Sequence, residues 1–323
     1  MEQRMISGRL RRLRARLREQ NLDGLVITKV ENVRYLTNFS GHDSWVLLTA
    51  RGCVLLTDSR YTEQARGECS GCRIVERKGP ITQALAGQLN GTGNPGRIGT
   101  EPSMSVATLR KIKSALRPQK ISVITAGTWI EQDRSVKDPP EAALIRRAAR
   151  IAWDGLHASL AHLQTGMTEQ QLTARLEYEI RIRGAKVGFE TIIAFGPNGS
   201  RNHHQPSGRK LRKQDTILID FGAAVDGYTC DITRSFGWGR VTREYERAWK
   251  TVLAAQQAAI AQIRDGVCAA EIDAAARQVI KPSGFPVYGH GTGHGLGLEV
   301  HEIPFGDMEI AVVAPSLSRH HLP

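Results

Sequence analysis

The chain has 323 residues, of which 41% are hydrophobic and 24% charged, and this composition excludes general disorder. A chain of this length suggests about two domains, and no apolar run approaches the length of a membrane-spanning helix. The five cysteines are too few for a secreted disulfide framework, so we expect a reducing, cytoplasmic setting.

The formal net charge of +12 is concentrated in clusters of Lys and Arg at 1–20, 108–120 and 201–213. Because the clusters are scattered and only 6% of residues are aromatic, solvent-exposed faces are favoured over a nucleic-acid surface. Within the first cluster, apolar residues recur every three or four positions, which predicts a helix rather than a transit peptide. These apolar residues are Ile6, Leu10, Leu13 and Leu17.

Helices and strands are predicted to alternate through the first 125 residues, which indicates an α/β layer. A loop is expected at residues 91–96. After the Arg-rich helix, the expected strands are 22–28, 46–48, 53–57, 73–76 and 121–124, and the expected helices are 62–67, 80–89 and 105–116.

A linker is predicted at 126–138, followed by a strong helix start. Asp138 suits the N-cap, Pro139 suits the first helical position, and Glu141 can complete a capping box. This helix is expected to run to about residue 163. We therefore expect an N-terminal domain over residues 1–135 and a second domain over residues 136–323.

A faint internal repeat runs through the second half of the chain. A helix opening at Gly166 and ending near Gly184 corresponds, 100 residues later, to one opening at Gly266 and ending near Gly284. Each is followed by an extended segment that leads into a His-bearing loop. The pattern predicts two related half-domains with a site between them, and a chance match is the alternative.

An apolar hairpin is predicted around the turn Asp226-Gly227. With that turn, Asp231 lies opposite Gly222, and Asp220 becomes its diagonal neighbour on the same face. Two carboxylates in an apolar hairpin repel each other unless a positive group lies between them. A divalent metal supplies such a charge. The alternative is that one aspartate faces solvent.

Histidines gather in two segments that follow helices of the repeat. His290, His294 and His301 fall within twelve residues that are rich in glycine. Glycine at alternate positions disfavours a helix, so we expect an extended segment that a ligand can approach closely. The glycine spacing does not match the dinucleotide fingerprint. A turn-rich loop at 196–206 carries His203. This density of histidine favours a functional site over separate structural roles.

Together these motifs resemble those of the creatinase and Xaa-Pro aminopeptidase family of metallopeptidases. The likeness runs from about residue 10 to residue 305 and is carried by 32–37, 57–61, 136–146, 203–206, 220–222, 231–234 and 289–302. It implies a creatinase-like α/β N-terminal domain. It also implies an α+β, pseudo-symmetric "pita-bread" catalytic domain, in agreement with the internal repeat.

The resemblance also implies roles for six side chains. The implied metal ligands are Asp220, Asp231 and His294, and the implied substrate-side histidines, which orient the peptide and stabilise the tetrahedral intermediate, are His203, His290 and His301. Two carboxylates with one imidazole suit Mn²⁺, which we expect first, or Co²⁺ or Zn²⁺. Two ions lower the pKa of a shared water, and the resulting hydroxide attacks the carbonyl before proline. The implied function is that of an aminopeptidase or dipeptidase acting on Xaa-Pro peptides.

The likeness stops after residue 304, where the family continues with two glutamate ligands. The acidic residues of 305–323 are Asp307 and Glu309, and neither has the expected context. We therefore expect an incomplete catalytic domain, as in a truncated or frame-shifted chain, with weak metal binding and severely reduced activity.

Three alternatives to metal-dependent peptide hydrolysis remain open. A non-catalytic relative that binds peptide or a partner agrees with the altered tail. Metal-free creatinase-type chemistry is disfavoured, because Asp220, Asp231 and His294 are all present. A basic nucleic-acid binder would lose affinity steeply with salt. We expect a peptide substrate with proline at the second position, no nucleic-acid or membrane partner, and a homo-oligomer, most simply a dimer.

Overall fold

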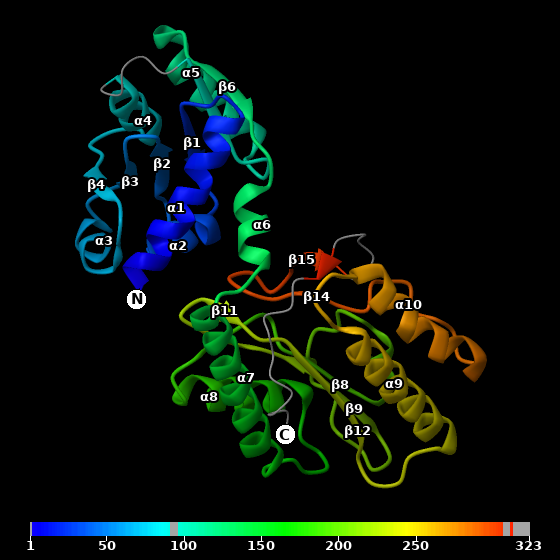
Figure 1. Ribbon diagram of the computed structural model, residues 1–323. Coiled ribbons are helices and arrows are strands. Elements are labelled where there is room, and N and C mark those ends of the chain that lie inside the picture. The colour runs from blue at the N-terminus through cyan, green and yellow to red at the C-terminus, as the bar shows by residue number, and fades with distance from the viewer. Residues whose placement is uncertain (1, 91–95, 306–310, 313–323) are drawn as a thin grey trace. The chain divides into compact units, whose positions relative to one another are not determined.

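The computed structural model describes residues 2–90, 96–305 and 311–312, and the chain forms two compact units, Met1–Arg134 and Ser135–Pro323 (Figure 1). Each unit has a buried apolar core of its own. Within the described ranges, no helix combines the length and apolar character that crossing a membrane requires.

The first unit is built on a six-stranded sheet with the order β4-β3-β2-β1-β5-β6. The central strands β1, β2 and β3 are antiparallel, whereas β4, β5 and β6 each join in parallel. The strands are β1 (Gly24–Ile27), β2 (Trp45–Thr49), β3 (Cys53–Thr57), β4 (Arg73–Glu76), β5 (Arg97–Thr100) and β6 (Ser122–Thr125). The helices are α1 (Glu2–Glu19), α2 (Val30–Thr37), α3 (Thr62–Glu68), α4 (Ile81–Asn90) and α5 (Val106–Leu116), with a 3₁₀ turn η1 (Arg117–Gln119).

The predicted α/β layer is confirmed, and every strand and helix expected there is present within two residues of its predicted ends. The sequence patterns missed α2 and β5. Most of the expected loop at 91–96 lies outside the described residues. The apolar stripe of α1 is fully buried, because Ile6, Leu10, Leu13 and Leu17 are each at most 3% exposed.

Arg11, Arg12 and Arg18 of α1 are exposed, as expected, but Arg9 and Arg14 correct the expectation that the whole cluster faces solvent. Arg9 is only 7% exposed. Its guanidinium lies 3.9 Å from the centre of the Tyr35 ring and donates a hydrogen bond of 2.8 Å to the Tyr35 carbonyl. Arg14 donates to the Thr49 carbonyl at 3.0 Å. The planar guanidinium of Arg9 stacks on a ring and donates a hydrogen bond at the same time. Arg9 and Arg14 therefore attach α1 to the rest of its unit.

The predicted linker contains a helix, α6 (Trp129–Ser135), which the sequence patterns missed, and the boundary between the two units falls within the same segment. Seven residues are too few for an independent helix, and distant residues hold this one in place. Arg16 forms an ion pair of 3.0 Å with Asp133. Arg134 is buried and donates a hydrogen bond of 2.7 Å to the side chain of Asn32. No local pattern in 126–138 announces contacts with residues about a hundred positions away.

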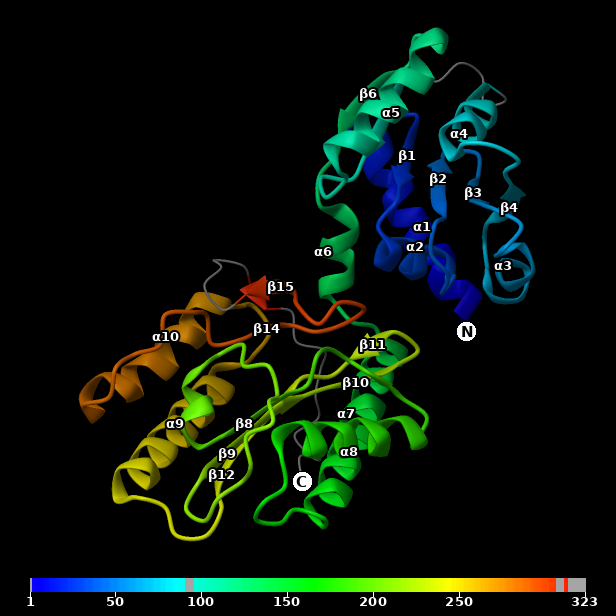
Figure 2. The same ribbon diagram turned by 180° about the vertical axis from the view of Figure 1, so that it is seen from behind.

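The second unit has short antiparallel sheets flanked by two pairs of helices. Figures 1 and 2 show the sheet β12-β9-β8 running between the pair α7/α8 and the pair α9/α10. The helices are α7 (Pro139–Leu160), α8 (Glu169–Ile182), α9 (Arg243–Gln262) and α10 (Ala269–Ile280), with 3₁₀ turns η2 (Gly196–Ser200) and η3 (Lys281–Ser283). The strands are β7 (Lys186–Val187), β8 (Ile192–Phe195), β9 (Thr216–Phe221), β10 (Ala223–Val225), β11 (Tyr228–Thr229), β12 (Ile232–Gly237), β13 (Val267–Cys268), β14 (His294–Gly295), β15 (Glu302–Phe305) and β16 (Ala311–Val312).

The core of this unit joins α7 and α8 to β8 and β9. Leu172, Leu176 and Ile180 point from α8 into this core and are completely buried. They meet Ile193 and Ile219 from the sheet. The opposite pair, α9 and α10, packs through a separate and smaller cluster of alanines and isoleucine. The larger of the two clusters therefore includes residues of strand β9, which carries Asp220.

The two repeat helices share their backbone geometry at both ends. Gly166 and Gly266 precede α8 and α10, and Gly184 and Gly284 follow them, and all four have φ between 80° and 94°. Such positive φ values favour glycine. The match supports the predicted repeat. The copies differ afterwards, because β8 follows α8, whereas no strand lies between α10 and β14 in the described chain.

The predicted capping box of α7 is confirmed. The Asp138 carboxylate accepts from the Glu141 amide at 2.9 Å, and the Glu141 carboxylate accepts from the Asp138 amide at 2.8 Å. Glu141 also accepts from the Tyr228 hydroxyl at 2.8 Å, which ties the helix start to β11.

Replacing Asp138 with alanine is expected to lower the free energy of unfolding by about 1 kcal/mol, because the Glu141 amide then loses its acceptor. Asp138→Asn keeps a side-chain oxygen and serves as the control. Urea unfolding of the two variants measures the difference. Equal stability of the alanine and asparagine variants would show that the cap contributes nothing here.

Candidate active site

The two aspartates are placed by the register of one long hairpin. The turn at Asp226-Gly227 pairs Val225 with Tyr228, as predicted. The same register continues into β9 and β12, where Thr233 pairs with Asp220. Asp231 directly precedes β12 and is therefore the diagonal neighbour of Asp220, also as predicted.

The two strands of the hairpin approach each other closely at Gly222, between the sheet that contains β9 and β12 and the sheet that contains β10 and β11. A side chain at this position would collide with the Cys230 carbonyl, so only glycine fits. The register places Asp231 opposite this glycine, on the same face as Asp220. The motif Asp220-Phe221-Gly222 therefore has a structural reason as well as a chemical one.

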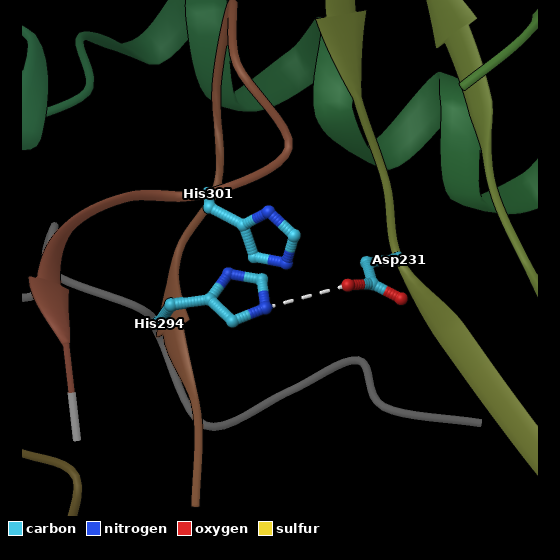
Figure 3. A group of neighbouring side chains, drawn as sticks. All are labelled: Asp231, His294 and His301. Carbon is cyan, nitrogen blue, oxygen red and sulfur yellow. Dashed lines mark ion pairs between the residues drawn. The ribbon is translucent and has the colours of Figure 1, made fainter. Parts of the chain in front are cut away.

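His294 and His301 lie beside Asp231, as Figure 3 shows. The His294 Nε2 atom is 3.4 Å from an Asp231 carboxylate oxygen. The two imidazole rings meet edge to face, with centroids 4.3 Å apart. Each of the three residues offers a ligand atom within 4.8 Å of the others. This convergence joins residues that are 70 positions apart in the sequence.

The electrostatics of this cluster indicate a missing positive charge. Burial raises the pKa of Asp220, and the neighbouring Asp231 carboxylate raises it further. A hydrogen bond of 2.8 Å from the Thr233 hydroxyl and the charge of His203 act in the opposite direction. A hydrogen bond with Asp231 raises the pKa of His294. Among the described residues, adjacent carboxylates thus lie beside imidazoles, and this donor set fits a divalent cation.

Two glycines after His294 allow its segment to pack closely against β15, Gly295 on the backbone and Gly297 on a buried carboxylate. Gly295 lies opposite Glu302 in the pair β14/β15, and a side chain at Gly295 would lie 2.5 Å from the Ile303 carbonyl. A side chain at Gly297 would lie 2.5 Å from the Glu302 carboxylate. Glu302 is itself buried and pairs with Lys137 at 2.8 Å. Gly297 thus lets the His294 segment pack directly on the carboxylate of this ion pair.

Two of the predicted histidines lie outside the three-residue cluster. His290 is exposed and stacks on the Tyr288 ring, with centroids 5.2 Å apart. Arg277 holds this segment, because it donates to the backbone carbonyls of Tyr288 and His290 at 2.8 and 2.7 Å. His203 is also exposed, and its charge acts on Asp220 from the loop that follows η2.

Sequence reasoning missed the side chains that support the histidine segments. Asp273 on α10 accepts from the Thr292 amide at 2.9 Å and forms an ion pair of 2.5 Å with Arg277. Their spacing of four residues on a helix was the available signal. Asp307 and Glu309, the acidic residues of the tail, lie outside the described residues.

The second unit matches the model of metallopeptidase family M24 over residues 143–315, which is more than half of the chain. The chain belongs to family M24. Residues 9–136 match the creatinase/prolidase N-terminal domain. The resemblance found in the sequence is therefore confirmed, and so is the fold class of a creatinase-type domain followed by an M24 catalytic domain. This M24 chain is a peptidase, and its family uses divalent metal ions.

Relatives and solved structures of this M24 peptidase agree with that assignment. It is 32% identical to the uncharacterized peptidase YqhT of Bacillus subtilis, over 92% of this chain and 84% of that protein. It is 28% identical to the Xaa-Pro dipeptidase of Pyrococcus horikoshii, over 88% and 80% of the two chains. The structure of the Xaa-Pro dipeptidase from Bacillus anthracis superposes with a TM-score of 0.89 at 30% identity, over 95% and 86% of the chains.

Proposed function

We propose that this M24 peptidase hydrolyses the peptide bond before proline, as an aminopeptidase or dipeptidase acting on Xaa-Pro substrates. The observation that carries the proposal is the convergence of Asp231, His294 and His301 beside Asp220. The substrate class is supported by relatives that are Xaa-Pro dipeptidases.

We propose Asp220, Asp231 and His294 as the metal ligands. Mn²⁺ is the expected ion, since hard carboxylates with an imidazole suit it, and two ions per chain are expected from the family resemblance. When bound, a divalent ion supplies a water of lowered pKa and a Lewis-acidic contact for the scissile carbonyl. The carboxylates hold the positive charge, and the Thr233 hydroxyl orients one of them at 2.8 Å.

We propose that the three remaining histidines bind and orient the peptide. His301 lies nearest, with its ring against His294. A charge on His203 lowers the pKa of Asp220, and His290 lies on the segment that Arg277 holds. Imidazole N–H groups placed around the scissile bond can donate to the oxygen on which negative charge develops, and such donors are typically worth about 10²–10³ in rate.

Purified protein loaded with excess Mn²⁺ is expected to release proline from an Xaa-Pro dipeptide at a severely reduced but measurable rate. The corresponding Xaa-Ala dipeptide should be cleaved at least about tenfold more slowly still, which is the discrimination expected from about 1.4 kcal/mol of differential transition-state binding. A chelator should abolish turnover, and added Mn²⁺ should restore it. An Xaa-Pro-Yaa tripeptide separates aminopeptidase from dipeptidase action. Equal cleavage of both dipeptides would refute the substrate class, and activity in chelator would refute the metal dependence. Peptide binding without turnover would instead support the non-catalytic alternative.

We also propose the second unit, residues 136–323, as the catalytic domain of a cytoplasmic homodimer. The site residues named above all belong to this unit. Cys53, Cys69, Cys72 and Cys230 form no disulfide, which supports a reducing compartment. The dimer rests on the family resemblance alone, and light scattering of the purified protein tests it.

A further inference from the structure

The Glu169 carboxylate accepts hydrogen bonds from several residues of the loop that carries His203. Glu169 is the first residue of α8 and is completely buried. One of its oxygens accepts from the Phe195 amide at 2.8 Å and from the Asn198 side chain at 2.9 Å. The other oxygen accepts from His204 Nε2 at 2.8 Å and from the Ser207 hydroxyl and amide at 2.6 and 2.9 Å. All these donors belong to the segment 195–207.

Two adjacent histidines of this loop are in opposite environments. His204 is 5% exposed and faces Glu169 in the interior. His203 is exposed, and its charge acts on the Asp220 carboxylate. Because the two residues share one peptide bond, fixing His204 in the interior also fixes the backbone from which His203 extends.

The charge of Glu169 makes this anchor strong. Burial opposes ionisation, but the hydrogen bonds from His204, Ser207, Asn198 and Phe195 outweigh it and lower the pKa of Glu169 to about 2. The group is therefore an anion at neutral pH, and hydrogen bonds to an anion are roughly twice as strong as neutral ones.

The helix itself does not require this carboxylate. Thr168 and Gln171 already form a complete capping box, with bonds of 3.1 and 2.9 Å. The side chain of Glu169 is directed away from the helix end and into the loop, where it accepts five hydrogen bonds. Helix capping therefore does not account for its position.

We propose that Glu169 is a positioning residue that, through His204, holds the loop 195–207 and so fixes the backbone from which His203 extends. This inference rests on the proposed peptidase function of the Asp220–Asp231–His294 site. It assigns no contact with substrate to Glu169 or His204. Their effect on catalysis passes entirely through the placement of His203.

Glu169→Gln tests the proposal, because glutamine keeps the shape but has only one accepting oxygen and no charge. We expect kcat for an Xaa-Pro dipeptide to fall about 10²-fold, the loss typical of a displacement of about 1 Å, with KM changed less than about threefold. Hydrogen exchange of amides in 195–207 should accelerate, while the rest of α8 keeps its protection.

Glu179→Gln is the matched control. Glu179 is a buried glutamate of the same helix, but its carboxylate forms ion pairs with Arg175 at 2.6 Å and with Arg183, which both belong to α8 or its end. We expect it to leave kcat and the exchange of 195–207 unchanged. An equal loss in both variants would show a general effect on α8 and would overturn the proposal.

His204→Gln and His204→Leu test the connection to His203. The glutamine amide can donate in place of His204 Nε2, so we expect it to retain most of kcat, whereas leucine should behave like Glu169→Gln. Equal activity of both His204 variants would overturn the positioning role. If the wild-type protein hydrolyses no Xaa-Pro peptide, the proposed function fails, and the exchange comparison still decides whether Glu169 holds the loop.

Discussion

Replacing Asp231 with asparagine is expected to reduce kcat/KM for an Xaa-Pro dipeptide by at least about 10³-fold. Even partners outside the first coordination shell typically contribute 10–100-fold to metal affinity or activity, and Asp231 lies at the centre of the cluster. It approaches His294 at 3.4 Å, shares the cluster with His301, and is the diagonal neighbour of Asp220. Asparagine keeps the shape of the Asp231 side chain but removes its negative charge. In the wild-type protein the carboxylate would hold the cation, and its hydrogen bond raises the pKa of His294.

A measurement that does not depend on activity separates metal loss from misfolding. A metal that binds only the folded state stabilises it by about 2.7 kcal/mol when its concentration is 100 times Kd. We therefore expect Mn²⁺ to raise the unfolding temperature of the wild-type protein but not that of Asp231→Asn. Metal content after dialysis should change in parallel.

Asp226→Asn is the control for this experiment. Asp226 is an exposed aspartate of the same hairpin, and its φ of 48° is a conformation that asparagine tolerates. We expect it to keep both the activity and the response to Mn²⁺. Retention of both properties by Asp231→Asn would instead remove Asp231 from the metal site.

The parts of the structure that the sequence predicted well are governed by local interactions. The turn at Asp226-Gly227 sets the register, and the register alone makes Asp220 and Asp231 diagonal neighbours. The capping box of α7 likewise depends on residues three positions apart. In such cases a few neighbouring side chains contain the whole physical argument, so it can be made before the fold is known.

The parts that the sequence did not predict depend on distant partners. Helix α6 exists because residues of α1 and α2 bind it. Arg9 is buried because a tyrosine ring from α2 covers it. A charged residue in a charged cluster gives no sign that a ring some 26 positions away will cover it. The expectation of an exposed face therefore failed at these positions.

The candidate site divides in the same way. The histidine-rich motifs were visible in the sequence, but their grouping was not. The structure places His301 with Asp231 and His294 and leaves His290 on an exposed segment. Glu169 looked like an ordinary acidic residue in the first turn of a helix. Only the fold of the segment 195–207 over α8 shows that it binds that loop instead.

Replacing Lys137 with methionine is expected to lower the free energy of unfolding by about 3–5 kcal/mol, the usual cost of leaving one partner of a buried ion pair uncompensated. The side chains of Lys137 and Glu302 are only 11% and 5% exposed, and their charged atoms are 2.8 Å apart. The variant would leave the Glu302 carboxylate buried next to the His301 backbone, with the Glu299 amide at 3.1 Å as a remaining donor. Methionine fills a similar volume, so the loss reports on charge rather than on packing.

A second substitution distinguishes the buried charge from other causes. Adding Glu302→Gln to Lys137→Met removes the buried carboxylate charge that has lost Lys137 and keeps an acceptor for the Glu299 amide, so the double variant should recover much of the lost stability. Lys213→Met, at an exposed position of the same unit, should change stability by less than about 0.5 kcal/mol. Urea unfolding of the four proteins measures these differences. If the double variant were no more stable than Lys137→Met, desolvation of Glu302 would not be the cause. Recovery would show that Lys137 neutralises the buried Glu302 carboxylate against which Gly297 of the His294 segment packs.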